Sequence, residues 1–242
     1  MIKTVLRRCW LLVPIAAVVA AGFALTTVGL PKGAYAQSGE LEQGSFGTWR
    51  YTAYLEGRVA TALVTHELNR ASDVDAFLAE NRRLVGELQQ QGVTEAQVVV
   101  TFRTLQDRAA LEQWVSSTPI RPASATARVA SGPHGKGTLG LPISRDNLTR
   151  DLNAGIDFLA TFHQQGKIAT NQVSGYYGVD GTANLGDIET ILRHPSVAAV
   201  DVSGAYAKRR VEANPAVSSQ RTPVTVVAKP IYYQLETLGL AR

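Results

Sequence analysis

The stretch from Val173 to Ala205, VSGYYGVDGTANLGDIETILRHPSVAAVDVSGA, decides the fold, because it has the pattern of a strand, a helix and a second strand. Its first part alternates with the period of a half-buried strand and places four residues on one face: Val173, Gly175, Tyr177 and Val179. Apolar residues then recur at helical spacing from Leu185 to Leu192. Pro195 ends that helix, because proline cannot continue the hydrogen-bond ladder. The second strand carries Val197, Val200 and Val202.

The segments before this stretch extend the same pattern towards the N-terminus. Residues 97–103 (QVVVTFR) predict a strand rich in β-branched side chains, and residues 147–165 predict an amphipathic helix. From Val98 to Val202 the expected order is strand, helix, strand, extra helix, strand, helix, strand. Two β-α-β halves in this order are typical of the ferredoxin-like split βαβ plan, with helices on one face of an antiparallel sheet. We therefore expect an α+β fold with a ferredoxin-like domain over residues 96–205.

The regions flanking this domain are expected to hold a hairpin, a helix and a tail. Within residues 37–95, the alternation around Gly57 predicts a β-hairpin over 49–65, and a helix follows from Ser72 to about Gln91. Glycine-rich composition indicates a linker at 37–47 and a flexible loop at 131–142. Residues 206–242 are expected to form a C-terminal tail with one possible strand, at residues 222–228.

Residues 1–36 have the pattern of an export signal. A basic segment ends at Arg8, an apolar run follows over residues 9–30, and Ala34-Tyr35-Ala36 places small residues where a signal peptidase reads. Cleavage before Gln37 predicts a secreted or periplasmic protein. Retention predicts a signal anchor in the plasma membrane, because the run is close to the roughly 20 residues that span a bilayer. In both cases the body lies outside the cytoplasm. The pair Arg7-Arg8 leaves twin-arginine export open beside the general route.

The basic charge of the chain lies in this leader. The formal net charge is +4, but the leader holds four basic residues and no acid, so residues 37–242 carry 20 basic and 20 acidic residues. A neutral body lacks the electrostatic attraction on which binding to a phosphate backbone rests, and nucleic acid is therefore not an expected partner. The single cysteine, Cys9, also lies in the leader, so the body has neither disulfides nor a cysteine-ligated metal.

The sequence contains no recognisable catalytic motif. Arg70 stands where a zincin motif beginning at His66 needs its second histidine, and Leu141-Pro142 follow the glycine pattern of 135–140 where a dinucleotide site needs a helix. No two of the four histidines have metal-ligand spacing: His66, His134, His163 and His194. Three nearby carboxylates are typical of solvated acids at a loop and helix start rather than of a calcium site: Asp180, Asp187 and Glu189. We expect no cofactor and no metal.

Two tyrosine pairs and a basic run are the candidate partner surface. Each pair places aromatic rings on both faces of an extended segment, so we expect one ring in the core and the other, Tyr176 or Tyr232, on a binding surface. The run Lys208-Arg209-Arg210 could contact an anionic surface, although three charges in a neutral domain are typical of a solvated face.

Three short motifs between Tyr177 and Gly204 resemble the extracytoplasmic C-terminal domain of some bacterial anti-sigma factors. The motifs are Y-G-V-x-G, L-x-x-I-x-x-I-L-x-x-P-S-V and V-D-V-S-G. The strand from Val98 to Arg103 is also similar to that domain's opening strand. The likeness covers residues 96–204 and implies an extracytoplasmic sensing or interaction module. The ending H-P-S-V-A-A-V is also similar to the last helix and strand of subtilisin-type propeptides, which share the ferredoxin-like plan.

Three functions follow as hypotheses. The first is an exported or membrane-anchored, non-enzymatic module that binds a protein or another component of the bacterial cell envelope. The second is an exported hydrolase or metal-dependent enzyme whose residues converge only in space, such as His134, His163 or His194 with Asp180 or Asp187. The third is a protease-inhibitor or propeptide-like module, which needs a sheet edge or a tail able to enter a protease cleft.

Overall fold

The computed structural model describes residues 39–131, 135–166 and 172–241, and these form an α+β fold with two sheets. The four-stranded sheet has the order β1-β2-β3-β9, with β1 (Gly39–Phe46), β2 (Trp49–Glu56), β3 (Val59–His66) and β9 (Val224–Val227). The five-stranded sheet has the order β6-β5-β7-β4-β8, with β4 (Glu95–Gln106), β5 (Ile120–Ser131), β6 (Gly135–Pro142), β7 (Val173–Asn184) and β8 (Val197–Asp201). All neighbouring strands are antiparallel except β3 and β9. The predicted α+β class is confirmed.

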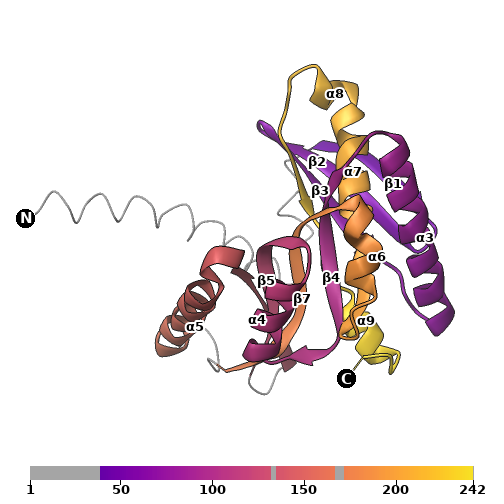
Figure 1. Cartoon of the computed structure of the whole chain (residues 1–242). Coiled ribbons are helices and arrows are strands. Elements are labelled where there is room, and N and C mark those ends of the chain that lie inside the picture. Colours follow the sequence, from indigo (N-terminus) through magenta and orange to yellow (C-terminus); the bar gives the residue numbers. More distant parts are fainter. Residues whose placement is uncertain (1–38, 132–134, 167–171, 242) are drawn as a thin grey trace, which may run out of the picture.

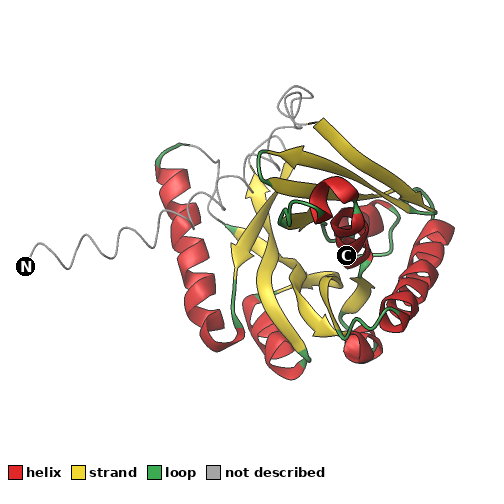
Figure 2. Ribbon diagram, turned by 90° about the horizontal axis from the view of Figure 1, so that it is seen from above, coloured by secondary structure: helices red, strands yellow, loops and turns green. Residues whose placement is uncertain are grey.

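Seven α-helices and two short 3-10 helices connect the described strands (Figure 1). The α-helices are α3 (Ala71–Gln90), α4 (Arg108–Ser117), α5 (Leu148–Gln164), α6 (Ile188–Leu192), α7 (Ser203–Ala213), α8 (Pro215–Ser218) and α9 (Tyr232–Thr237). The 3-10 helices are η1 (Arg145–Asn147) and η2 (Leu185–Asp187). Helices α4, α5 and α6 pack on the five-stranded sheet, and α7 packs on the four-stranded sheet. Figure 2 shows the long helices α3 and α5 on opposite sides of the strands.

Strand β4 lies between β7 and β8 and places apolar side chains on the helix-covered face, as predicted. Val98, Val100 and Phe102 are fully buried there, and the Phe102 ring meets Trp114 of α4 edge-on with centroids 5.0 Å apart. On the opposite face the hydroxyl of Thr101 accepts a hydrogen bond from the Ile231 amide at 3.1 Å. The strand is buried on both faces because the C-terminal segment covers the side that the helices leave open.

The predicted hairpin and the helix after it are confirmed. Strands β2 and β3 pair in continuous register around Gly57, whose φ of +60° suits a residue without Cβ. Helix α3 begins where the side chain of Asp73 accepts the amides of Asn69 and Arg70, both at 3.0 Å. It ends before Gly92, which has a φ of +78°. The buried residues of α3 have helical spacing: Val74, Phe77, Asn81, Leu84 and Leu88.

Two segments predicted to be irregular are strands. Residues 39–46 of the predicted linker form β1, which pairs with β2, and residues 135–142 of the predicted flexible loop form β6, which pairs with β5. Glycine-rich composition favours loops, but a neighbouring strand satisfies the backbone groups here. In β6, Leu139 and Leu141 are buried as well. The composition therefore gave the wrong structure at both positions.

The predicted tail over residues 206–242 is an integral part of the fold. Its candidate strand is confirmed as β9. Helices α7 and α8 come before β9 in the sequence, and α9 comes after it. The predicted boundary after Ala205 falls inside α7, because β8 ends at Asp201 and the helix begins at Ser203. The expectation of a final strand reaching Val202 was wrong.

The leader over residues 1–36 and His134 lie outside the described residues. Within the described ranges, no helix combines the length and the apolar character needed to cross a membrane.

Candidate functional site

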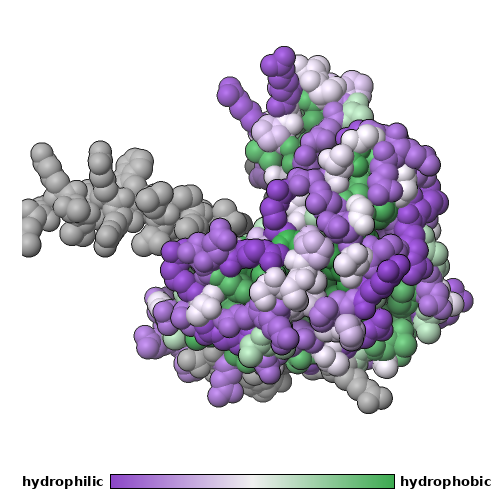
Figure 3. Space-filling view, in the orientation of Figure 1, coloured by the Kyte–Doolittle hydropathy of each residue, from purple (hydrophilic) through white to green (hydrophobic). Residues whose placement is uncertain are grey.

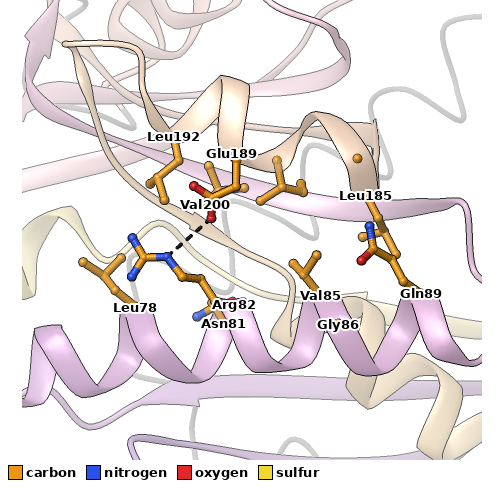
Figure 4. Close-up of a pocket in the computed structure, with 12 residues that line it drawn as sticks. Leu78, Asn81, Arg82, Val85, Gly86, Gln89, Leu185, Glu189, Leu192 and Val200 are labelled. Atoms are coloured by element: carbon orange, nitrogen blue, oxygen red, sulfur yellow. Dashed lines mark hydrogen bonds and ion pairs between the residues drawn. The ribbon is translucent and has the colours of Figure 1, made fainter.

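The main candidate site is a groove of about 290 Å³ between α3 and the η2–α6 segment (Figure 4). Side chains from α3 form one wall, and those from η2 and α6 form the other. Val200 of the edge strand β8 lies between them. The lining residues are Leu78, Asn81, Arg82, Val85, Gly86, Gln89, Leu185, Gly186, Ile188, Glu189, Leu192 and Val200. The surrounding face is largely hydrophilic, and its apolar areas lie between charged side chains (Figure 3). This is a small apolar groove with a few polar groups, the composition typical of a ligand site.

The groove exists because α3 runs beside the edge of β8. Asn81 holds the two together: its side-chain oxygen accepts the Val202 amide at 2.8 Å, and its nitrogen donates to the Phe77 carbonyl at 3.1 Å. Asn81 is 3 % exposed, so this polar group in the wall is already satisfied inside the protein.

Two glycines line the groove, one from each wall. Gly86 lies inside α3 and Gly186 inside η2, and a Cβ added to either would meet no heavy atom within 4 Å. Neither glycine has the positive φ that requires a residue without a side chain. Their missing side chains therefore leave free space rather than relieve a clash.

Charged side chains lie at one end of the groove, and an amide lies at the other. Arg82 Nε is 3.4 Å from Glu189 Oε1, and the two side chains are 58 % and 53 % exposed. Ion pairs this exposed contribute about 0–1 kcal/mol, so a ligand can displace either partner at small cost. Gln89 lies at the opposite end, near Leu185 (Figure 4).

A second polar cluster joins the two sheets. His66, at the end of β3, places Nε2 3.1 Å from Oδ2 of Asp201, at the end of β8. The Ser203 amide donates to Asp201 Oδ1 at 2.8 Å, and Ser203 Oγ lies 3.5 Å from His66 Nε2. The imidazole and carboxylate side chains are each 3 % exposed, and Ser203 is fully buried.

This cluster has the residue types of a hydrolytic triad but not its geometry. In a triad, the serine and the carboxylate contact opposite nitrogens of the imidazole, and the serine oxygen is open to substrate. Here Ser203 and Asp201 both lie beside Nε2, and the serine is closed to solvent. The arrangement is that of a structural contact between β3 and β8.

Two carboxyl groups near this contact have shifted pKa values in opposite directions. Burial raises the pKa of Asp201, but His66 and the hydrogen bonds from Ser203 outweigh it and hold the pKa below its ordinary value. For Asp180 on β7, burial raises the pKa from 3.8 to about 6, although Ser124 Oγ donates to its carboxylate at 2.9 Å. The charge of Asp201 adds to the shift at Asp180.

The two tyrosines predicted for a partner surface are buried. Tyr176 is 2 % exposed and Tyr232 is 0 % exposed. Strand β7 has a bulge here, because Thr126 pairs with Gly178 while Ala127 pairs with Tyr176. The extra residue, Tyr177, belongs to the core under the C-terminal segment, and Tyr176 belongs to the larger core. The predicted common face for Tyr177 and Val179 was therefore wrong.

Residue Tyr232 lies in helix α9 rather than in an extended segment. Its ring packs against Tyr177 with centroids 5.2 Å apart, and the Tyr177 hydroxyl donates to Thr138 Oγ1 at 2.8 Å. Burial of Tyr177 raises its pKa. The aromatic pairs hold the C-terminal segment on the five-stranded sheet.

Each member of the basic run in α7 has a partner within the protein. Lys208 Nζ lies 2.6 Å from Glu212 Oε1, and Arg209 Nε donates to Gln91 at 3.1 Å. The third, Arg210, hydrogen-bonds the Tyr51 hydroxyl, which also contacts Glu42. Burial and this carboxylate raise the pKa of Tyr51 to about 12. The run is a set of helix-surface contacts, spread over different neighbours.

The remaining candidate residues have separate local partners. His194 Nδ1 lies 2.8 Å from Ser196 Oγ, and Asp187 accepts a hydrogen bond from Asn184 at 3.3 Å. His163 is exposed near the end of α5. The part of the chain that the structure describes has no group of three or more His, Asp or Glu side chains able to hold a metal ion.

Sequence reasoning did not predict the groove or the His66–Asp201 contact. Arg82, Gly86 and Gln89 lie on α3, 100 residues or more before Glu189, and no local motif links them. One signal was available for the groove: a glycine in the interior of a 20-residue helix costs stability and calls for an explanation.

Compared with known proteins, the chain matches no protein-family model, no curated protein and no solved structure.

Proposed function

We propose that the chain is an exported or membrane-anchored, non-enzymatic interaction module of the bacterial cell envelope, and that it binds its partner in the groove between α3 and α6. The observation that carries the proposal is the groove itself. It is open, its walls are mainly apolar, and the charged pair at its end is held by a single contact of 3.4 Å.

The sequence supports the location and the kind of module. The leader over residues 1–36 has the pattern of an export signal, and the body is electrically neutral. We further propose that β8, β4, β7 and β5 with α4 and α6 form a ferredoxin-like unit, extended by β6 and α5. Their order and antiparallel pairing support this plan, which the resemblance to anti-sigma factor outer domains also implies.

Position-specific photo-crosslinking in the envelope tests the proposal. Gln89→p-benzoylphenylalanine places the reactive ketone in the groove, and Ala76→p-benzoylphenylalanine places it on an exposed position of the same helix outside the groove lining. We expect a discrete adduct from position 89 that is absent from position 76. The adduct should also disappear when Gly86→Leu fills the groove in the same chain. Equal adducts at both positions, or none at position 89, would reject the groove as the binding site.

A further inference from the structure

We infer that the groove takes a short apolar segment of a polypeptide, with peptide amides at one end of the groove and a charged or polar flank at the other. This inference rests on the proposed function and adds the chemistry of the partner. It follows from the polar groups at the ends of the groove, from its length and from its two glycines.

The polar groups match a peptide better than an acyl chain. Arg82 alone would favour a fatty-acid carboxylate, but Glu189 lies 3.4 Å from its Nε and repels an anion at the same place. A polypeptide flank that carries a donor and an acceptor can pair with both. At the other end Gln89 offers one amide donor group and one acceptor, the complement of a peptide unit.

The dimensions agree with a few residues of chain. The α3 wall extends from Leu78 to Gln89, which at 1.5 Å per residue is about 16 Å. An extended segment of about five residues covers that distance. Between the polar ends, Val85 and Ile188 offer apolar surface for one or two side chains.

The glycines mark the space that such a side chain would fill. Gly86 is an unfavourable residue for the interior of α3, and neither its φ nor a neighbouring atom requires it. Gly186 of η2 also lines the groove and has the same freedom. A larger side chain at Gly86, which lines the groove, would occupy open space, so the chain accepts a weaker helix where an open groove results.

A displayed library of random 12-residue peptides, selected on the immobilised body of the protein, tests the inference. Selected peptides are synthesised, and their Kd values are measured against the wild type, Gly86→Leu and the matched control Ala76→Leu. We expect peptides with a central apolar residue, at least tenfold weaker binding to Gly86→Leu, and unchanged binding to Ala76→Leu. Both variants should remain folded, because leucine is a better helix former than glycine and Ala76 is exposed.

Fluorescent dodecanoate is the second probe and separates this inference from the proposed function. Groove-dependent binding of dodecanoate, with no groove-dependent peptide, would overturn the peptide inference and leave a groove that binds another envelope component. Peptides whose affinity ignores Gly86→Leu would also overturn it. If neither probe depends on Gly86 and position 89 gives no crosslink, the proposed function fails as well.

Discussion

The carboxyl group of Asp180 is held on the inner side of β7 by Ser124, at a site that favours its protonated form. Because the pKa rises from 3.8 to about 6 on folding, the folded protein binds a proton more tightly than the unfolded chain. Stability from this group is therefore greatest below pH 4 and is lost as the pH rises through 6. At about 1.4 kcal/mol for each tenfold change in proton affinity, the loss is about 2–3 kcal/mol.

We therefore expect Asp180→Asn to be more stable than the wild type at pH 8 by about 2 kcal/mol, and to lose this advantage by pH 4. Urea unfolding at the two pH values measures the difference. Asp157→Asn, an exposed change in α5, serves as the control. A variant that gains equally at both pH values would contradict a charge effect at this carboxyl group.

The opposite behaviour is expected for Asp201. Its lowered pKa means that its charged form stabilises the fold above the unfolded pKa and that this stability is lost as the pH falls through the folded pKa. Asp201→Ala leaves the buried imidazole of His66 without its carboxylate, at a cost of about 3 kcal/mol near pH 7. A double-mutant cycle with His66→Ala should give a coupling energy well above zero, and additive effects would show that the pair is not coupled.

At the residue scale, the sequence predicted the roles of residues that depend on neighbours close in the sequence. It missed the roles of residues whose partners are far away in the sequence. The turn at Gly57 and the end of α3 at Gly92 follow from conformational preferences that a few residues express. His66 meets Asp201 across 135 positions of chain, and that encounter is set by how two sheets pack. The predicted exposure of Tyr176 failed because both faces of β7 are covered: Tyr176 belongs to the larger core and Tyr177 to the core under the C-terminal segment.

At the scale of elements, the close contact between β7 and the C-terminal segment can be tested by a single substitution. A Cβ on Gly178 would lie 2.8 Å from the Val100 carbonyl oxygen and would also collide with Pro230. Gly178→Ala should therefore lower the free energy of unfolding by about 1–3 kcal/mol, because overpacking must displace backbone or the proline ring. Urea unfolding measures this, and Gly140→Ala, where a Cβ meets nothing within 4 Å, is the matched control. Equal effects would show that this contact yields easily.

Elements whose apolar residues recur with a helical or strand period could be predicted from the sequence. Elements that are strands only because a neighbouring strand pairs with them could not. Helix α3, the hairpin of β2 and β3, and strand β4 have apolar periods that a short window reveals. Strands β1 and β6 lack such a period, and each is a strand because a neighbour supplies hydrogen-bond partners. The groove also belongs to this second class, because its two walls come from helices far apart in sequence.

At the scale of the whole molecule, one large core includes buried residues of both sheets, from Trp49 to Val217. The C-terminal segment makes two separate contacts with the rest of the fold. Strand β9 pairs with β3, and the residues after β9 cover the inner face of the five-stranded sheet. A chain ending at Thr222 should therefore lack a cooperative thermal transition, because both contacts are removed together. Circular dichroism and size-exclusion chromatography measure the outcome.

A synthetic peptide of residues 223–241 provides the control for that truncation. Added in excess, it should restore the transition if the shorter chain fails only for want of these contacts. A shortened chain that melts cooperatively at the wild-type temperature would show that the C-terminal segment is dispensable.

The parallel pairing of β3 with β9 also determines when β3 can complete its hydrogen bonds during synthesis. Residues 60–63 leave the ribosome long before their partners at 224–227 have been made. Until β9 is present, during synthesis or any passage across a membrane, the backbone groups on one side of β3 have no hydrogen-bonding partner. Such an open strand invites pairing with other unfinished chains. Newly made copies should therefore depend on a holding chaperone until β9 emerges, and slower translation of the codons between β3 and β9 should increase aggregation.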